Sequence, residues 1–107
     1  HAPPTLASWK LICDERTLVS PEAVIVPLTD AELVLLKTLL IDPGKPTSRR
    51  KLIEALGFDY LTYDERRLEV RMSRLRKKIR DLTGGEEPLK SEWGIGYLFT
   101  GIRLATK

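Results

Sequence analysis

Residues 66–80 read RRLEVRMSRLRKKIR, and this stretch decides the fold. It contains eight basic side chains and one acidic side chain, Glu69, which gives it a formal charge of +7. The whole chain has 18 Lys and Arg against 15 Asp and Glu, a net charge of +3, so the remaining residues sum to −4. Positive charge concentrated on one segment is typical of proteins that bind the phosphate backbone of a nucleic acid.

A helical arrangement separates this segment into two stripes. Advancing roughly 100° per residue gives an apolar stripe about 80° wide, which should be buried. Its members are Leu68, Met72, Leu75, Ile79 and Leu82. Beside it lies a cationic stripe of Arg67, Arg71, Arg74 and Lys78, with Val70 at its edge.

The cationic stripe has no acidic residue between its members. Neighbouring like charges on a helix repel by about 0.2–0.5 kcal/mol per pair, so such a stripe favours a polyanionic partner. A merely solvated helix face is the alternative, although acidic side chains normally alternate with basic ones on such faces. The pattern therefore predicts nucleic-acid binding by this helix.

Bulk properties limit the class of protein. A length of 107 residues indicates one domain, which we place at residues 6–103. Residues 1–5, HAPPT, hold two prolines and no periodicity, which indicates a linker or a cloning remnant. No apolar run approaches the roughly 20 residues of a membrane span, so no membrane partner is expected. Cys13 is the only cysteine, which excludes an internal disulfide and fits a reducing cytosol, and we expect it to fill space in a sheet.

The sequence carries no catalytic or metal-binding pattern. His1 is the only histidine, and there is no Cys/His metal spacing, no P-loop and no G-x-S-x-G. Asp64 and Glu65 are adjacent carboxylates, but the dipole at the start of a helix explains them. We therefore expect neither an enzyme nor a bound metal or other cofactor.

Short strands are expected at the start of the chain. Residues 6–13, 16–20 and 24–28 are rich in apolar side chains and separated by turn signals, which predicts a small antiparallel meander. Pro27 cannot donate to a strand ladder, so the third strand should be short or lie at an edge.

Capping residues mark the first two helices. Thr29 and Glu32 have the spacing of a capping box, which predicts the start of the first helix. Ser48 can cap a second helix over residues 49–56, and Gly57 suits the end of that helix.

The third helix and a hairpin complete the chain. Thr62 begins a second capping-box pattern, which predicts a helix over residues 63–82. Residues 89–93 and 97–102 then read as two strands. They are joined by Gly94-Ile95-Gly96, whose glycines on both sides of the tip permit the positive φ angles that a tight hairpin needs.

This order of elements is that of an α+β winged helix-turn-helix, with an N-terminal antiparallel sheet, three helices and a C-terminal β-hairpin as the wing. Four motifs, spread over roughly residues 8–100, resemble the output domains of bacterial two-component response regulators of the OmpR/PhoB type. They are Leu28-Thr29-x-x-Glu32 followed by Leu35-Leu36, Ser48-Arg49-x-x-Leu52, Arg66-x-Leu68-x-Val70 with Ser73-Arg74-Leu75-Arg76-Lys77, and Gly94-x-Gly96-Tyr97-x-Phe99.

The resemblance implies sequence-specific binding of double-stranded DNA and transcriptional regulation, with the third helix in the major groove and the wing, about residues 89–100, on the backbone or in the minor groove. It implies an N-terminal receiver domain that takes part in a phosphorelay, dimers on direct-repeat promoter sites, and a cytoplasmic, nucleoid-associated protein. It also implies that the loop before the third helix touches RNA polymerase, through Phe58, Asp59 and Tyr60.

Matching positions to the family assigns roles to individual residues. Candidates for base edges are Arg67, Val70, Arg71 and Arg74, because an arginine fork matches guanine and an apolar side chain suits a thymine methyl. Candidates for phosphate contacts, which orient a protein without reading sequence, are Arg66, Arg76, Lys78, Ser91 and Tyr97. Surface salt bridging is the alternative for Arg66 and Arg76, and packing against the third helix is the alternative for Tyr97.

The wing tip departs from the family pattern. Many relatives place an arginine there, where it enters the minor groove, whereas this chain has Trp93 next to Gly94. Trp93 could pack on ribose and backbone, or fold back on the domain.

Other functional classes remain open at this stage. A winged helix can serve as a protein–protein interaction module, and membrane-anchored one-component activators use the same kind of DNA-binding domain. The proline-containing leader and the end of the chain soon after Phe99 favour a C-terminal output domain. RNA is disfavoured, because the cations are expected on a helix and not on a sheet studded with aromatic residues.

Titration with duplex DNA at several salt concentrations tests the charge argument. Each phosphate that the protein neutralises adds about −0.9 to the slope of log affinity against log salt, so we expect a steep loss of affinity. A protein-interaction module would give a flat response, or no binding to DNA even in dilute salt.

Overall fold

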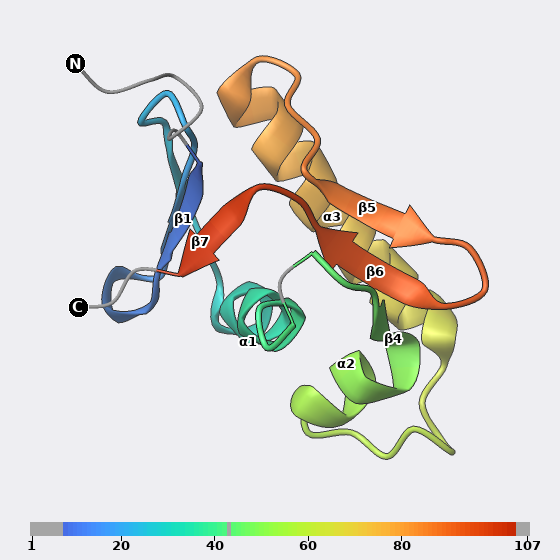
Figure 1. The fold of residues 1–107 in the computed structure, drawn as a ribbon. Helices are drawn as coiled ribbons and strands as arrows, with labels where there is room; N and C mark the ends of the chain where they lie inside the picture. The colour runs from blue at the N-terminus through green and yellow to red at the C-terminus, as the bar shows by residue number, and fades with distance from the viewer. Residues whose placement is uncertain (1–7, 43, 105–107) are drawn as a thin grey trace.

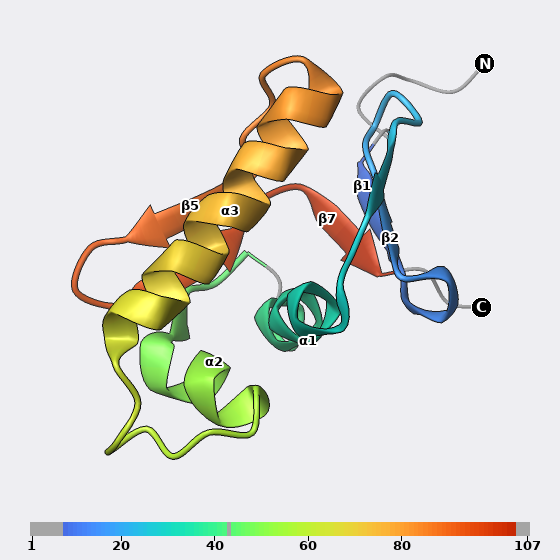
Figure 2. The same cartoon turned by 180° about the vertical axis from the view of Figure 1, so that it is seen from behind.

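The computed structural model describes residues 8–42 and 44–104, with side chains described up to Gly101. Three helices, α1 (Asp30–Leu39), α2 (Arg49–Ala55) and α3 (Glu65–Thr83), combine with two β-sheets (Figure 1). α3 passes behind the hairpin strands in Figure 1 and in front of them in Figure 2, so it covers one face of the hairpin. The α+β winged-helix architecture is confirmed, while the expectation for residues 1–5 lies outside the described residues.

The first sheet contains the expected meander and one further strand. Strands β1 (Trp9–Ile12), β2 (Thr17–Val19) and β3 (Ile25–Pro27) are antiparallel neighbours, and β7 (Ile102–Leu104) pairs parallel with β1. The order is β3-β2-β1-β7, so Pro27 lies in an edge strand as predicted. The three expected strands are shorter than the sequence suggested.

The turn between β1 and β2 explains part of this shortening. Cys13 begins a short 3₁₀ helix, Cys13–Glu15, and Arg16 follows in the left-handed conformation with φ 51°. The expectation that Cys13 lies in the sheet is therefore wrong. Its half-buried side chain packs against the core from this turn.

The second sheet is the wing, and it is larger than a hairpin. Strands β5 (Leu89–Glu92) and β6 (Gly96–Phe99) pair antiparallel, and the two-residue strand β4 (Thr47–Ser48) pairs with the other edge of β6. The expected strand over residues 97–102 is present but ends at Phe99, because the chain bends there. Gly101, with φ 72°, lies in this bend, after which β7 joins the first sheet.

The two glycines of the wing tip are needed for different structural reasons. Gly94 has φ 78°, the positive value predicted for a tight hairpin. Gly96 does not adopt a positive φ, so that part of the prediction is wrong. It is a close-approach glycine, because a Cβ there would lie 1.8 Å from the carbonyl oxygen of Thr47 in β4.

Local side-chain caps start α1 and α2 as predicted. The hydroxyl of Thr29 accepts from the Glu32 amide at 3.2 Å, and the Glu32 carboxylate accepts from the Thr29 amide at 2.9 Å. The Ser48 hydroxyl accepts from the Lys51 amide at 3.1 Å, and Gly57 follows α2 with φ 94°.

The cap of α3 differs from the prediction. Asp64 is the N-cap, and its carboxylate accepts from the Arg66 amide at 3.0 Å. Thr62 cannot serve because its own amide, like that of Tyr63, donates to the Asp59 carbonyl and closes a turn before the helix. α3 therefore begins at Glu65 and ends at Thr83. Gly84 is its C-cap, and its φ of 78° turns the chain so that the Gly85 amide donates to the carbonyl of Arg80 at 2.9 Å.

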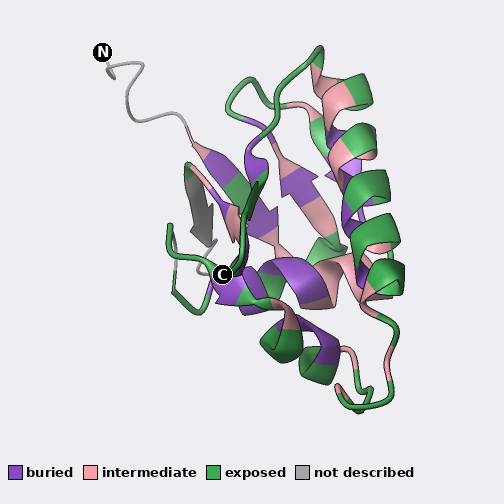
Figure 3. Ribbon diagram, turned by 90° about the vertical axis from the view of Figure 1, so that its right-hand side faces the viewer, coloured by how far each residue is buried: buried purple, intermediate pink, exposed green. Residues whose placement is uncertain are grey.

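The apolar stripe of α3 forms much of the core (Figure 3). Leu68, Met72, Leu75 and Ile79 are buried, whereas Leu82 is exposed. The prediction is wrong at Leu82 because the last turn of α3 projects beyond the hairpin strands (Figure 1). From the two sheets, Trp9 and Phe99 meet edge to face with ring centroids 5.8 Å apart. No helix within the described ranges is both long and apolar enough to cross a bilayer.

Gly96→Ala should test the contact between the wing and β4. The new methyl group must displace backbone, so we expect a loss of about 3 kcal/mol or more in the free energy of unfolding, measured by urea denaturation. Gly94→Asn is the matched control, because nothing lies within 4 Å of its Cβ position and asparagine tolerates the left-handed conformation. Equal losses in the two variants would contradict the close-approach explanation.

Candidate nucleic-acid interface

The outer face of α3 brings four side chains together. Arg67, Val70, Arg71 and Arg74 line a shallow, open hollow of about 240 Å³. The helical periodicity placed these residues on or beside the cationic stripe, and the family resemblance made them base-contacting candidates; the structure places all four on one surface. Among the residues that the structure describes, no acidic side chain lines this hollow.

The cationic stripe does not continue to Lys78. Its ammonium Nζ lies 2.6 Å from Oε1 of Glu32 on α1, and the two side chains are only 29% and 15% exposed. The expectation of an uninterrupted stripe is therefore wrong at this position, because an acid from another helix meets it. A phosphate contact from Lys78 would have to compete with Glu32.

Glu32 links two helices through one carboxylate oxygen. Its Oε1 accepts both from the Thr29 amide, closing the capping box, and from Lys78 Nζ. The same side chain thus starts α1 and holds the C-terminal half of α3 against it.

At the other end of the stripe, Arg67 contacts the loop before α3. Its guanidinium carbon lies 5.3 Å from the ring centroid of Tyr63 and 6.0 Å from that of Phe58. Distances of this size are typical of cation–π contacts. The helical periodicity of the sequence could not predict this contact, because both rings lie outside the helix.

A second hollow, of about 220 Å³, lies between α3 and the wing. Its lining includes three of the predicted phosphate-contacting residues, Arg76, Ser91 and Tyr97. Arg49 also lines it, a residue with no predicted role beyond its place in the Ser48-Arg49 motif. One acid, Glu69, is part of the lining.

Two groups in this hollow have unusual surroundings. Nε of Arg76 is buried without a hydrogen-bond partner among the described residues. Tyr97 is 3% exposed, and the Arg49 guanidinium lies over its ring at 5.2 Å. Burial raises the pKa of Tyr97. The ring of Tyr97 belongs to the hydrophobic core and lies under Arg49 of α2.

Arg66 takes part in the helix cap. Its guanidinium donates to both carboxylate oxygens of Asp64, at 3.3 and 3.2 Å. This contact lowers the pKa of Asp64 and raises the pKa of Arg66. The salt-bridge alternative for Arg66 is thus present in the structure, on an exposed surface where such a pair contributes little.

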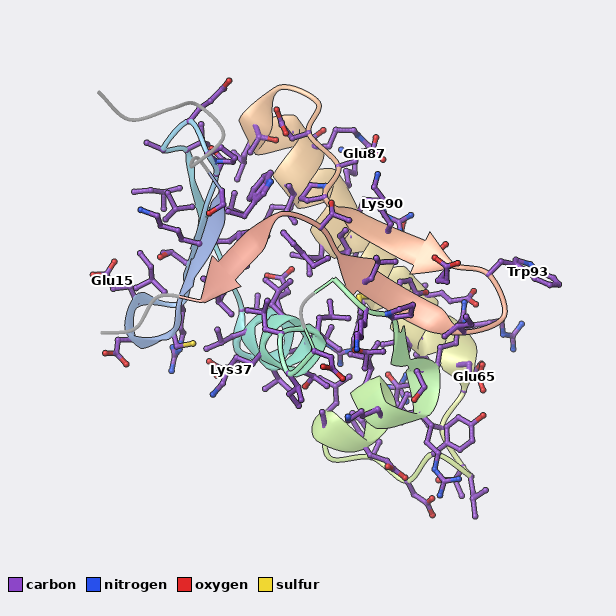
Figure 4. The ribbon with its side chains drawn as sticks, in the orientation of Figure 1. Glu15, Lys37, Glu65, Glu87, Lys90 and Trp93 are labelled. Carbon is purple, nitrogen blue, oxygen red and sulfur yellow. The ribbon has the colours of Figure 1, made fainter. Side chains whose placement is uncertain are left out.

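Trp93 is the most exposed large apolar side chain of the described residues, at 94%. Figure 4 shows it projecting from the wing tip away from the body of the domain, so the alternative that it folds back is wrong. Residues 91–101 contain no Lys or Arg and one acid, Glu92. The wing tip therefore carries no positive charge and presents an apolar side chain.

The loop that contains Phe58, Asp59 and Tyr60 joins α2 to α3. Asp59 organises it by accepting from the amide of Leu61, whose side chain is exposed. The Arg50 guanidinium lies 5.3 Å from the Tyr60 ring centroid, and the neighbouring Glu65 carboxylate raises the pKa of Tyr60. The exposure of Leu61 was not predicted, because a single leucine in a loop carries no periodic signal.

Within the part of the chain that the structure describes, no group of three or more His, Cys, Asp or Glu side chains could hold a metal ion. The two hollows described above are instead lined largely by arginine and hydroxyl groups. Such donors suit phosphate oxygens and base edges.

Comparison with known sequences identifies a family. The family described as "Transcriptional regulatory protein, C terminal" matches residues 22–99. The transcriptional regulatory protein BaeR of Escherichia coli strain CFT073 is 36% identical over 92 residues, which cover 85% of this chain and 38% of BaeR. The sensory transduction protein BceR of Bacillus subtilis is 34% identical over 98 residues, which cover 90% of this chain and 42% of BceR. The chain thus spans about two fifths of these relatives.

Solved structures agree in fold. The DNA-binding domain of RstA from Klebsiella pneumoniae, solved in complex with the RstA box, has a TM-score of 0.68 and 29% identity, covering 85% of this chain and 89% of that one. The DNA-binding domain of the response regulator AdeR, solved with an intercistronic region, has a TM-score of 0.72 over 88% of this chain and 95% of that one. At 21% identity, AdeR supports the fold alone.

The Glu32–Lys78 pair should stabilise the docking of α3 on α1. A double-mutant cycle with Glu32→Gln and Lys78→Met should give a coupling energy of about 1–2 kcal/mol, because the pair is charged and mostly buried. Glutamine keeps an acceptor for the Thr29 amide, so the cycle isolates the charge.

Lys77→Met is the control for this cycle, because it removes the exposed pair between Lys77 and Asp81. It should change the free energy of unfolding by less than about 0.5 kcal/mol. A Glu32–Lys78 coupling no larger than that value would show that the pair does not hold the helices together.

Proposed function

This chain belongs to the family of C-terminal domains of transcriptional regulatory proteins, and from that premise we propose that it binds specific double-stranded DNA as the output domain of a two-component response regulator. The observation that carries the proposal is the hollow on the outer face of α3, which Arg67, Val70, Arg71 and Arg74 line without an acid. An α-helix fits the major groove of B-DNA, where base edges differ between all four base pairs.

Arg71 and Arg74 are the strongest candidates for reading bases. Among the described residues, neither forms an ion pair with a carboxylate, unlike Arg66 and Lys78. A guanidinium can donate two parallel hydrogen bonds to O6 and N7 of guanine. Val70 lies beside them, where its methyl groups suit the methyl group of thymine.

The hollow between α3 and the wing suits a backbone phosphate. Arg49 and Arg76 supply positive charge. The hydroxyls of Ser91 and Tyr97 are further donors on the same lining. A phosphate held there would fix how α3 enters the major groove without reading sequence itself. Arg66 and Lys78 contribute less in this proposal, because each already has a carboxylate partner.

The wing tip contributes by apolar contact. Without a cation it cannot use the negative potential of a narrow minor groove, which attracts arginine. The exposed indole of Trp93 can pack on sugar edges, and Gly94 keeps the turn tight enough to present it. This part of the interface should depend little on salt.

The rest of the proposed assembly follows from the family. Relatives such as BaeR are more than twice as long as the matching segment, which leaves room for an N-terminal receiver domain. We propose that this domain controls dimerisation on direct-repeat promoter sites in the cytoplasm, at the nucleoid. The loop with Phe58, Asp59 and Tyr60, beside the exposed Leu61, is the proposed contact to RNA polymerase.

Arg71→Ala and Arg74→Ala should each weaken binding by about 1–3 kcal/mol and relax preference at one base pair. The preferred duplex is first selected from a random library, and affinities are then measured for its single-base variants. Lys37→Ala on α1 is the matched control, because Lys37 is an exposed lysine far from the wing in Figure 4. It should weaken binding slightly, and equally for all sequences.

Two other outcomes would count against these roles. Uniform weakening by Arg71→Ala and Arg74→Ala across all duplexes would make both residues phosphate contacts. Failure of the wild-type protein to prefer any duplex in the library would overturn the proposed function.

A further inference from the structure

The guanidinium of Arg67 rests on a pair of aromatic rings. Its Cζ lies 5.3 Å from the ring centroid of Tyr63 and 6.0 Å from that of Phe58. The two rings contact each other, with centroids 4.9 Å apart and planes inclined by 34°. Phe58 and Tyr63 therefore form an aromatic shelf under the first turn of α3.

Backbone hydrogen bonds hold this shelf in place. The Asp59 carbonyl accepts from the Tyr63 amide at 3.0 Å, and the Phe58 amide donates to the carbonyl of Ile53 in α2. The Tyr63 side chain packs against the hydrophobic core. Its hydroxyl is buried without a hydrogen-bond partner in the described part of the chain, so the ring, and not a polar contact, holds this side chain there.

The cation–π contacts leave the donors of Arg67 free. A ring attracts the charge of a guanidinium without accepting a conventional hydrogen bond, and the guanidinium carries five N–H donors. Arg67 also lines the hollow on the outer face of α3 together with Arg71 and Arg74. A guanidinium held at this position can donate to a base while it stays in cation–π contact with the rings.

Ordering Arg67 in advance should strengthen its contact with DNA. A long, flexible side chain loses rotamer freedom when it binds, and a side chain that is already held loses less. We infer that Phe58 and Tyr63 are positioning residues that hold the guanidinium of Arg67 for a base edge. This inference rests on the proposed function, since it needs Arg67 to read a base.

The inference links the loop to DNA reading. Because coupling between two sites is reciprocal, any partner that moves the aromatic shelf changes the preference at the base pair of Arg67. The same partner binds better or worse according to that base pair. The loop proposed to touch RNA polymerase is thereby connected to the recognition surface.

Affinity for single-base variants of the selected duplex tests the inference. Arg67→Ala first identifies the base pair at which discrimination depends on Arg67. Tyr63→Leu should then reduce discrimination at that base pair by about 2- to 5-fold, the size expected for an exposed cation–π contact, and leave other positions unchanged. Phe58→Leu should also reduce discrimination at that base pair. Because the Phe58 ring is more exposed, this variant replaces Tyr63→Leu in the test if Tyr63→Leu fails to fold.

The double variant separates positioning from general stability. In the Arg67→Ala background, Tyr63→Leu should cause no further loss of discrimination. Tyr63→Phe keeps the ring and removes only the unpaired hydroxyl, so it should discriminate like the wild type. Tyr60→Leu is the matched control in the same loop, because its ring lies over Arg50 and not Arg67.

Three results would overturn the inference. They are an equal loss from Tyr63→Leu with and without Arg67, a loss from Tyr63→Phe as large as that from Tyr63→Leu, and an Arg67→Ala variant that keeps full discrimination at every base pair. Absence of any sequence preference in the wild type would overturn the proposed function instead, so the two failures are distinguishable.

Discussion

The burial of one stripe of α3 is the constraint on which the rest of the structure depends. Leu68, Met72, Leu75 and Ile79 are at most 1% exposed. Each contributes about 1.5–3 kcal/mol by leaving water, so together they fix the rotation of the helix about its axis. Once that rotation is fixed, the face that holds Arg71 and Arg74 must point away from the core.

Tertiary contacts then divide the cationic stripe among different tasks. Lys78 pairs with Glu32, a residue 46 positions earlier in the chain, and Arg67 rests on rings from the preceding loop. Arg71 and Arg74, between these anchored ends, make no ion pair within the described residues. The cationic stripe, which the helical periodicity predicted to be uniform, therefore has two anchored ends and a centre that is open to a ligand.

The accuracy of the sequence predictions follows the range of the interactions. The caps of α1 and α2 were predicted correctly because three or four adjacent residues contain the whole interaction. The cap of α3 was wrong because Thr62 and Asp64 both fit locally, and the turn at Asp59 decides between them. Strands β4 and β7 were missed because each is defined by a partner far away in the chain, β6 and β1 respectively.

The sequence by itself determined the three helices, the hairpin, most of the buried stripe of α3 and the arginines beside that stripe, because periodicity and local capping are properties of short segments. Only the tertiary structure decided that β4 and β7 join the sheets, that Lys78 is paired, that Gly96 is needed for close approach to Thr47, that Trp93 stays exposed and that Arg67 lies over Phe58 and Tyr63. Each of these depends on which groups lie nearby in space, and that follows from how the hydrophobic core packs helices and sheets together.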